Sequence, residues 1–221
     1  MRKLVLQVLA MLFAVFPTVA LAQAPKDGVY IGDEDIKAVL KHSADTHRTI
    51  PDNTLRVIDM GQYQLGVAVV ARGAMKGGGA ANANAPAGGG NAAPAAAANA
   101  ATACGEKRPG ATGPNGIFHD DTAESYVVIS GAGTLITGGT IVNGRRSGPN
   151  DEVTTVLNGP SCGGTMVGYT SRNVKVGDVI IIPEHVPHGF SAIPDHITYL
   201  SIRPDLKKVL QHGYVNPALK Q

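Results

Sequence analysis

The stretch GIFHDDTAESYVVISGAG, residues 116–133, carries the strongest structural signal in the sequence. It places His119 before a short polar turn and Glu124 at the head of an apolar strand. A second stretch, GDVIIIPEHVPH at residues 177–188, ends in His188. Imidazole and carboxylate groups are ligands that many transition-metal ions take in proteins. The sequence therefore raises the question of whether one fold brings these three side chains to a single point.

Strand geometry favours such a meeting. Side chains alternate between the two faces of a strand, so Glu124 shares a face with Tyr126. His119 ends one predicted strand, residues 120–123 turn, and Glu124 opens the next strand. A hairpin of this kind places the last inward residue of one strand beside the first inward residue of the other. In a small closed barrel, inward residues from further strands, such as the one before His188, reach the same cavity.

The two stretches resemble the paired motifs of the cupin superfamily, which are written G-x5-H-x-H-x3,4-E-x6-G and G-x5-P-x-G-x2-H-x3-N. The resemblance covers roughly the second half of the chain. It implies an all-β fold, the double-stranded β-helix (jelly-roll) barrel of that superfamily. The residues that match are His119, Glu124 and Gly131 in the first motif, and Gly177, Pro183 and His188 in the second.

The chain departs from these motifs at four positions. Ile117 stands where the family has its first histidine, and Ala111 stands at the opening glycine. His185 occupies the glycine of the second motif, and Ala192 occupies its asparagine. Three of the four usual metal ligands carry over, and these are His119, Glu124 and His188.

The resemblance implies a site for one divalent transition metal, with iron, manganese, zinc, nickel and copper as the metals that the family uses. Three protein ligands leave coordination positions open for water, oxygen or substrate, as in catalytic metal sites. Two histidines and one carboxylate are also the ligand set of non-haem iron(II) oxygenases. The alternative is a metal-free cupin in which these polar residues hydrogen-bond only to one another within the barrel.

Two further residues are candidates for catalysis. Tyr126 faces inward, two residues beyond Glu124, where it either donates a proton to a bound substrate or simply fills the barrel. His185 lies in a turn three residues before His188. It is either a fourth ligand or proton-transfer group, or a turn residue that faces solvent. Asp121 is either an outer-sphere partner of the site or a solvated turn residue.

These features predict a metal-dependent enzyme that acts on a small organic or sugar-derived substrate, with oxygenase-type chemistry favoured by the ligand set. An isomerase or a lyase is compatible with the same site. A barrel that binds a sugar or a small acid without turning it over is the alternative from another functional class. The family commonly pairs its barrels, which implies a homodimer.

Charge and composition argue against several other classes of protein. The 221 residues suit one domain and carry a net charge of +2, with 16% charged residues. So balanced a charge does not indicate a nucleic-acid partner or an anionic membrane surface. The 28 glycines suit a β protein with many turns.

Residues 1–22 have the pattern of a signal peptide. Two basic residues precede an apolar run at residues 4–16, which is shorter than the roughly 20 residues that a membrane span needs. Ala20-Leu21-Ala22 forms a small-x-small cleavage site before Gln23. We therefore expect an exported protein, periplasmic or extracellular, without membrane attachment after cleavage.

The remainder of the chain divides around one barrel. Residues 23–53 are predicted to form an N-terminal extension with a helix at 33–47, residues 54–204 the barrel, and residues 205–221 a tail. Residues 73–103 are rich in Ala, Gly and Asn and bury too little to offset the entropy of ordering, so we expect a disordered insertion. Strands are predicted at 55–59, 63–71, 115–119, 124–130, 134–137, 153–157, 165–169, 174–183, 188–192 and 196–203, with a short terminal helix at 205–210.

The two cysteines leave two possibilities open. Export would place Cys104 and Cys162 in an oxidising compartment, where they form a disulfide or remain two unpaired thiols. A disulfide would attach the end of the predicted insertion to the barrel. A structural zinc site is not indicated, because no Cys-x-x-Cys spacing is present.

Overall fold

The computed structural model describes residues 24–76 and 102–219. The predicted signal peptide, residues 1–22, and residues 77–101 of the predicted insertion lie outside the described residues. Within the described ranges, no helix combines the length and the apolar character that crossing a bilayer requires.

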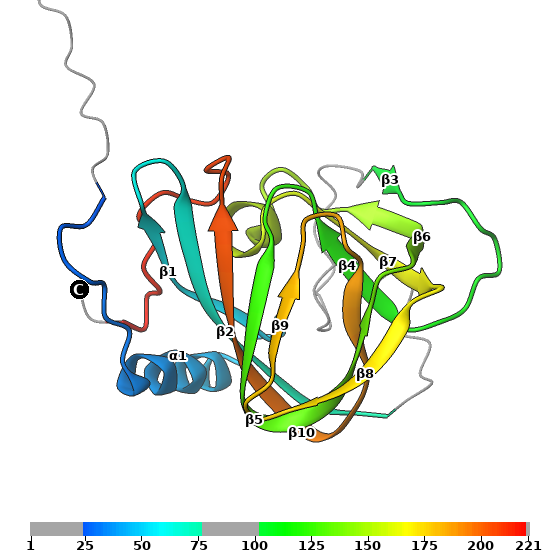
Figure 1. The fold of residues 1–221 in the computed structure, drawn as a ribbon, viewed down its shortest axis with the longest axis horizontal. Coiled ribbons are helices and arrows are strands. Elements are labelled where there is room, and N and C mark those ends of the chain that lie inside the picture. The colour runs from blue at the N-terminus through cyan, green and yellow to red at the C-terminus, as the bar shows by residue number, and fades with distance from the viewer. Residues whose placement is uncertain (1–23, 77–101, 220–221) are drawn as a thin grey trace, which may run out of the picture.

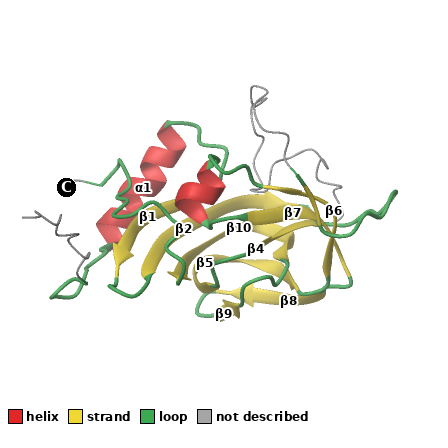
Figure 2. Ribbon diagram, turned by 90° about the horizontal axis from the view of Figure 1, so that it is seen from above, coloured by secondary structure: helices red, strands yellow, loops and turns green. Residues whose placement is uncertain are grey.

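Two antiparallel sheets face each other and form a barrel, as the sequence predicts (Figures 1 and 2). Two long strands, β5 (Glu124–Thr137) and β10 (His188–Asp205), belong to both sheets. The other strands are β1 (Asp52–Asp59), β2 (Gln64–Met75), β3 (Ala103–Cys104), β4 (Asn115–His119), β6 (Thr140–Arg146), β7 (Ser161–Val167), β8 (Thr170–Lys175) and β9 (Val179–Ile182).

The order of the strands follows from how β5 and β10 are divided between the sheets. The first half of β5 and the second half of β10 pair with each other in a sheet ordered β1-β2-β10-β5-β9. Their other halves pair in a sheet ordered β3-β6-β7-β4-β10-β5-β8. This arrangement is a jelly-roll barrel of the double-stranded β-helix type.

The sequence predicts two strands, at 124–130 and 134–137, with a turn between them, and this division is wrong because β5 is continuous. Gly131 has φ +70° and remains paired with Ile197 of β10. The glycine bends both strands from one sheet into the other without ending the ladder. The same bend joins the predicted strands 188–192 and 196–203 into the single strand β10.

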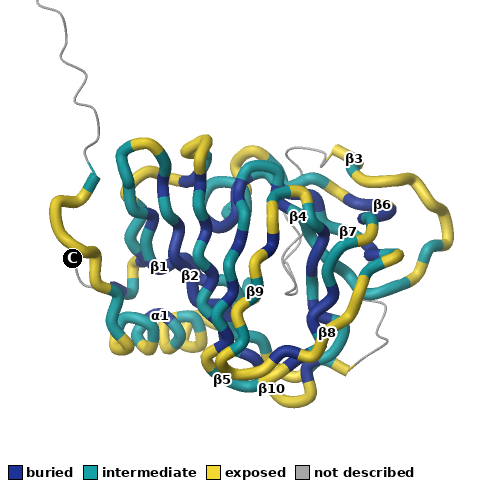
Figure 3. Tube along the Cα trace, in the orientation of Figure 1, coloured by how far each residue is buried: buried dark blue, intermediate teal, exposed yellow. Residues whose placement is uncertain are grey.

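Apolar side chains fill the space between the sheets, and the buried stretches of the chain lie along the strands (Figure 3). Tyr126 and Phe190 both belong to this interior cluster, as their alternation in the strands predicts. A second cluster joins the helix α1 (Asp33–Asp45) to the outer face of the first sheet, where Val39 packs with Leu55 and Val69.

The predicted strand at residues 153–157 is also wrong, because Val153–Leu157 form a π-helical turn, η1. The valines and threonines there favour strands, but local hydrogen bonds override that preference. The backbone carbonyl of Asp151 accepts hydrogen bonds from the N–H groups of Thr154 and Thr155. The N–H of Asn158 then bonds the carbonyl of Val153, five residues back.

The ends of the predicted insertion and of the barrel also differ from expectation. Residues 73–75 are part of β2, which pairs with β10 as far as Met75, and Ala103 and Cys104 form β3. The predicted helix at 205–210 is absent. The carboxylate of Asp205 instead accepts hydrogen bonds from the N–H groups of Val209 and Leu210, which stabilises a turn.

Cys104 and Cys162 form a disulfide that links β3 to β7. Their Cα atoms are 6.1 Å apart, and the bond closes a sequence separation of 58 residues. The segment that follows residues 77–101 is therefore covalently attached to the barrel wall.

Two glycines of the cupin-like motifs differ in what surrounds them, which gives a prediction. A Cβ added at Gly131 would lie 2.0 Å from the backbone oxygen of His196, whereas one at Gly177 would meet nothing within 4 Å. Both residues have positive φ, at +70° and +91°. We expect Gly177→Ala to cost about 1–2 kcal/mol of unfolding free energy from backbone strain alone. Gly131→Ala should cost more than about 4 kcal/mol, because the β10 backbone must also move.

Urea denaturation of the two variants measures this difference. Equal destabilisation by the two substitutions would show that the bend of β5 and β10 does not depend on their close approach at Gly131.

Candidate metal centre

Three predicted ligands meet at one end of the barrel. His119 is the last residue of β4, Glu124 the first of β5 and His188 the first of β10. Their ligand atoms all lie within 4.8 Å of one another, and the three residues are only 2–4% exposed. The Nε2 atoms of His119 and His188 lie 3.3 Å and 3.0 Å from Oε2 of Glu124.

The hydrogen-bond partners of the two imidazoles fix where their protons lie. Nδ1 of His188 is 3.0 Å from the carbonyl oxygen of Val186, which only accepts, so Nδ1 carries a hydrogen. Nδ1 of His119 is 2.7 Å from Oγ of Ser161. That hydroxyl donates its own hydrogen to the carbonyl of Gly159, so its oxygen accepts from the imidazole. Each ring therefore carries a hydrogen on Nδ1 and directs Nε2 at Glu124.

The other side of the Glu124 carboxylate is saturated with donors. Its Oε1 atom accepts hydrogen bonds from Asn158 Nδ2 at 2.9 Å, Ser201 Oγ at 2.8 Å and Arg203 Nε at 2.9 Å. Its Oε2 atom accepts one, from the hydroxyl of Tyr126 at 2.9 Å. The carboxylate is thus held rigidly with Oε2 toward the two imidazoles.

In the neutral form of each ring Nε2 bears a lone pair, so the two imidazole nitrogens and Oε2 of Glu124 then converge as acceptors. Lone pairs at such distances repel one another unless a cation lies between them. The separations of 3.0 Å and 3.3 Å fit a shared ion. Two ligands bound at about 2.1 Å and 90–109° apart are themselves about 3.0–3.4 Å apart. Ordering each imidazole through its second nitrogen is also typical of metal-binding histidines.

The jelly-roll topology and these converging side chains together decide the fold. The chain has the fold of the cupin superfamily. No protein-family model matches the chain, and a search of the curated proteins finds no match. The assignment of the cupin fold rests on the strand order and on the position of the three residues within it.

Solved structures similar to parts of the chain include two bacterial proteins. The DMSP lyase DddQ from Ruegeria pomeroyi is 14% identical, with a TM-score of 0.33, over 77% of this chain and 57% of that chain. The match thus spans little more than half of the lyase's length. The protein BH2720 from Bacillus halodurans is 11% identical, with a TM-score of 0.36, over 88% of this chain and 93% of that chain.

A chain of ion pairs holds the Glu124 carboxylate on the side opposite the two imidazoles. Arg203 is 1% exposed and its guanidinium bridges Glu124 and Asp52, with Nη2 2.6 Å from the Asp52 carboxylate. Its Nη1 atom donates to the carbonyl of Leu157 at 2.9 Å. Every edge of the guanidinium is therefore bonded, which offsets the cost of burying the charge.

The protonation states follow from burial and from these neighbours. Complete burial opposes the charge on Glu124, but the Arg203 guanidinium holds its pKa well below its usual range. Burial lowers the pKa of His119, against the opposing effect of Glu124. Burial and the adjacent Glu124 raise the pKa of Tyr126 well above its usual value. Near neutral pH the site therefore holds an ionised carboxylate, a neutral His119 and a protonated phenol.

Several residues of this site were not predicted from the sequence. The alternation of the last strand does carry a signal for two of them, since Ser201 and Arg203 share the inward face of Tyr199. No sequence signal points to Asn158, because the π-helical turn that positions it was not predicted. Ser161, which orders His119, is likewise identified only by the pairing of β4 with β7.

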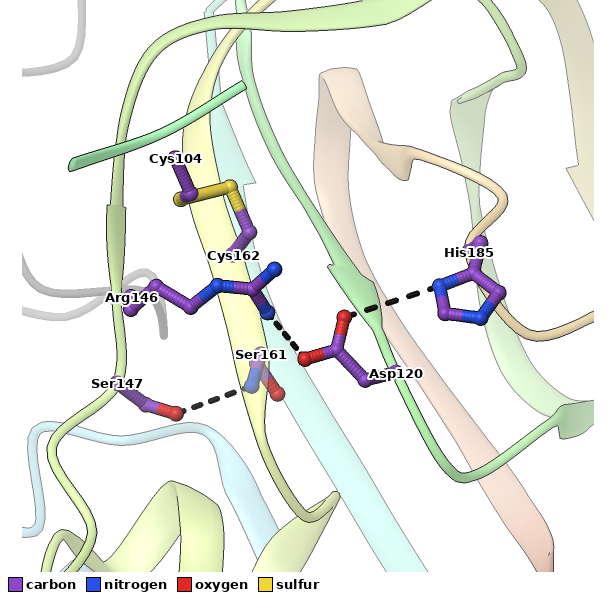
Figure 4. The surroundings of a disulfide bond; sticks show 7 residues. All are labelled: Cys104, Asp120, Arg146, Ser147, Ser161, Cys162 and His185. Atoms are coloured by element: carbon purple, nitrogen blue, oxygen red, sulfur yellow. Dashed lines mark hydrogen bonds and ion pairs between the residues drawn. A yellow bond between two sulfur atoms is a disulfide. The ribbon is translucent and has the colours of Figure 1, made fainter. Parts of the chain in front are cut away.

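The other predicted candidates lie outside the cluster of three ligands. The side chain of His185 is 65% exposed, and its Nδ1 lies 3.7 Å from Asp120, which in turn pairs with Arg146 (Figure 4). His185 has φ +62°, and its backbone N–H donates to the carbonyl of His119. It thus supports the site through the main chain. Asp121 forms an ion pair with the exposed Lys207.

The bonding of Arg203 leads to a prediction about stability. Arg203→Met would leave the buried carboxylate of Glu124 and the partly buried carboxylate of Asp52 without their counter-charge. We expect a loss of about 3–5 kcal/mol, as when one partner of a buried pair is removed. The matched control is Lys37→Met in the exposed pair with Asp33, which should cost less than about 0.5 kcal/mol.

Chemical denaturation at neutral pH gives both values. If Arg203→Met and Lys37→Met lower the free energy of unfolding by the same amount, the ion pairs of Arg203 contribute nothing specific to the stability of the fold.

Proposed function

We propose that this cupin binds one divalent transition metal ion at His119, Glu124 and His188. The observation that supports the proposal is the convergence of two imidazole Nε2 atoms and one carboxylate oxygen, with each ring oriented by a hydrogen bond at Nδ1. The donor set of two imidazoles and one carboxylate suits iron, manganese, zinc, nickel or copper. Of the usual ligands of the superfamily, one histidine is replaced by Ile117, which leaves three protein ligands.

We further propose that the metal site is catalytic and acts on a small organic substrate, with oxygenase-type chemistry favoured by the ligand set. A bound metal would supply Lewis acidity and open coordination positions. The chain's own residues would hold the geometry. Arg203, Ser201 and Asn158 fix the carboxylate, while Ser161 and the Val186 carbonyl orient the imidazoles.

In this proposal Tyr126 positions the Glu124 carboxylate and does not donate a proton to the substrate. Its hydroxyl already donates to Glu124, and its raised pKa keeps the proton on the phenol. It would therefore act as a positioning residue for the carboxylate.

One observation favours a second candidate, a cupin that binds a metal and a small acid or sugar without turning it over. The three ligand side chains are 2–4% exposed, so a substrate has little direct access to them. Oxygen uptake by iron-loaded protein in the presence of small organic acids separates the candidates. Substrate-dependent uptake that disappears in His188→Ala supports the oxygenase, and binding without uptake supports the non-catalytic cupin.

Metal titration tests the proposed site itself. Protein stripped of metal should take up one equivalent of Zn²⁺ or Co²⁺, as measured by elemental analysis and calorimetry. His119→Ala and His188→Ala should abolish this uptake, whereas His196→Ala, which removes an exposed histidine, should not. Ser161→Ala should weaken binding by about 10- to 100-fold, as loss of an outer partner of a ligand does.

A serine control isolates the effect of ordering His119. Ser130 makes a similar hydrogen bond, to Nε2 of the exposed His196 at 2.8 Å. Ser130→Ala should leave metal affinity unchanged. Stoichiometric metal binding that survives His119→Ala and His188→Ala together would exclude the proposed site.

We also propose that the protein is exported, with residues 1–22 removed. The disulfide between Cys104 and Cys162 supports this, because such bonds persist in oxidising compartments. N-terminal sequencing of protein secreted by a bacterial host should give Gln23 as the first residue. An intact Met1 on the protein, recovered in the cytoplasmic fraction, would contradict export.

A further inference from the structure

A cavity lies away from the three metal-ligand candidates. It has a volume of about 500 Å³ and lies between the C-terminal half of α1, the segment that follows it and the end of β2. Ligand pockets typically have volumes of about 300–1,000 Å³. Apolar side chains contribute part of the lining, among them Leu40, Pro51, Met75 and Ile193. Among the described residues no carboxylate lines the cavity, but two arginines do, Arg48 and Arg72.

The two arginines differ in how their charge is balanced. Arg48 forms a two-pronged ion pair with Glu152, at 2.7 Å and 3.1 Å, and donates to the carbonyl of Asp52. Arg72 has no carboxylate within ion-pairing distance in the described part of the chain. The nearby carboxylate of Asp52 is itself bonded to Arg203 at 2.6 Å.

Arg72 is also incompletely hydrogen-bonded. Its Nε atom is buried and has no hydrogen-bond partner among the described residues. Its guanidinium lies over the ring of Phe190, with Cζ 5.9 Å from the ring centre, and it interacts with Tyr199. Arg72 as a whole is partly buried, and a partly buried cation without a counter-ion is still costly. A guanidinium matches the two oxygens of a carboxylate.

We propose that this cavity binds a small monocarboxylate with an apolar chain, with the carboxylate bonded to Arg72. One unpaired guanidinium favours a single negative charge over a phosphate group. The apolar lining accommodates a short alkyl chain. The cavity is separate from the metal ligands. The test of this proposal therefore does not depend on whether the protein binds a metal ion.

Calorimetric titration with hexanoate tests the proposal on the protein that begins at Gln23. Wild-type protein should bind hexanoate saturably at one site. Arg72→Gln should weaken binding by about 10- to 100-fold, the effect of losing a charge-assisted hydrogen bond. The matched control is Arg145→Gln, which removes the same charge from an exposed position on β6 and should leave binding unchanged.

A second variant keeps the test valid if Arg72→Gln does not fold. Ser43 lines the cavity from α1, so Ser43→Phe should fill the space and abolish binding while Arg72 stays in place. Hexanol, which lacks the charge, and inorganic phosphate, which lacks the chain, should bind at least tenfold more weakly than hexanoate. Unchanged hexanoate affinity in either variant, no hexanoate binding by the wild type, or tighter binding of phosphate would overturn the proposal.

Discussion

The ion pair between Glu124 and Arg203 is the interaction on which the rest of the site depends. A carboxylate that is 2% exposed cannot stay ionised without a counter-charge, and Arg203 supplies it at 2.9 Å. The same guanidinium reaches Asp52 on β1 and the carbonyl of Leu157 in η1. One side chain of β10 therefore connects both long strands, the first strand and the π-helical turn. Its effect is to leave one carboxylate oxygen, Oε2, facing the two imidazoles.

The sequence predicted the parts of this centre that depend on spacing along the chain. His119, Glu124 and His188 follow from the motif pattern, and the inward position of Tyr126 follows from the alternation of a strand. Arg203 and Ser201 lie on the inward face of a predicted strand, so their burial was open to inference, but their partner on β5 was not. Ion pairs between residues 79 positions apart depend on strand order, which local sequence does not specify.

The errors in the predicted fold share a physical cause, since tertiary contacts override local preference. Residues 130–133 contain glycines and small residues that favour a turn, yet pairing with β10 continues the strand through them. The valines and threonines at 153–157 favour a strand, yet hydrogen bonds to Asp151 form a helical turn. That turn positions Asn158 against Glu124, so the segment that was hardest to predict supports the ligand that was easiest to identify.

The central claim is that both imidazoles carry their hydrogen on Nδ1 and present Nε2 to a shared cation. Nitrogen-15 NMR of histidine-labelled protein, recorded before and after one equivalent of Zn²⁺, measures this directly. The account predicts that two of the histidines retain an Nδ1–H signal throughout and that their Nε2 resonances alone shift on metal binding. Zinc-dependent shifts at Nδ1 of these rings, or no shift at either nitrogen, would contradict it.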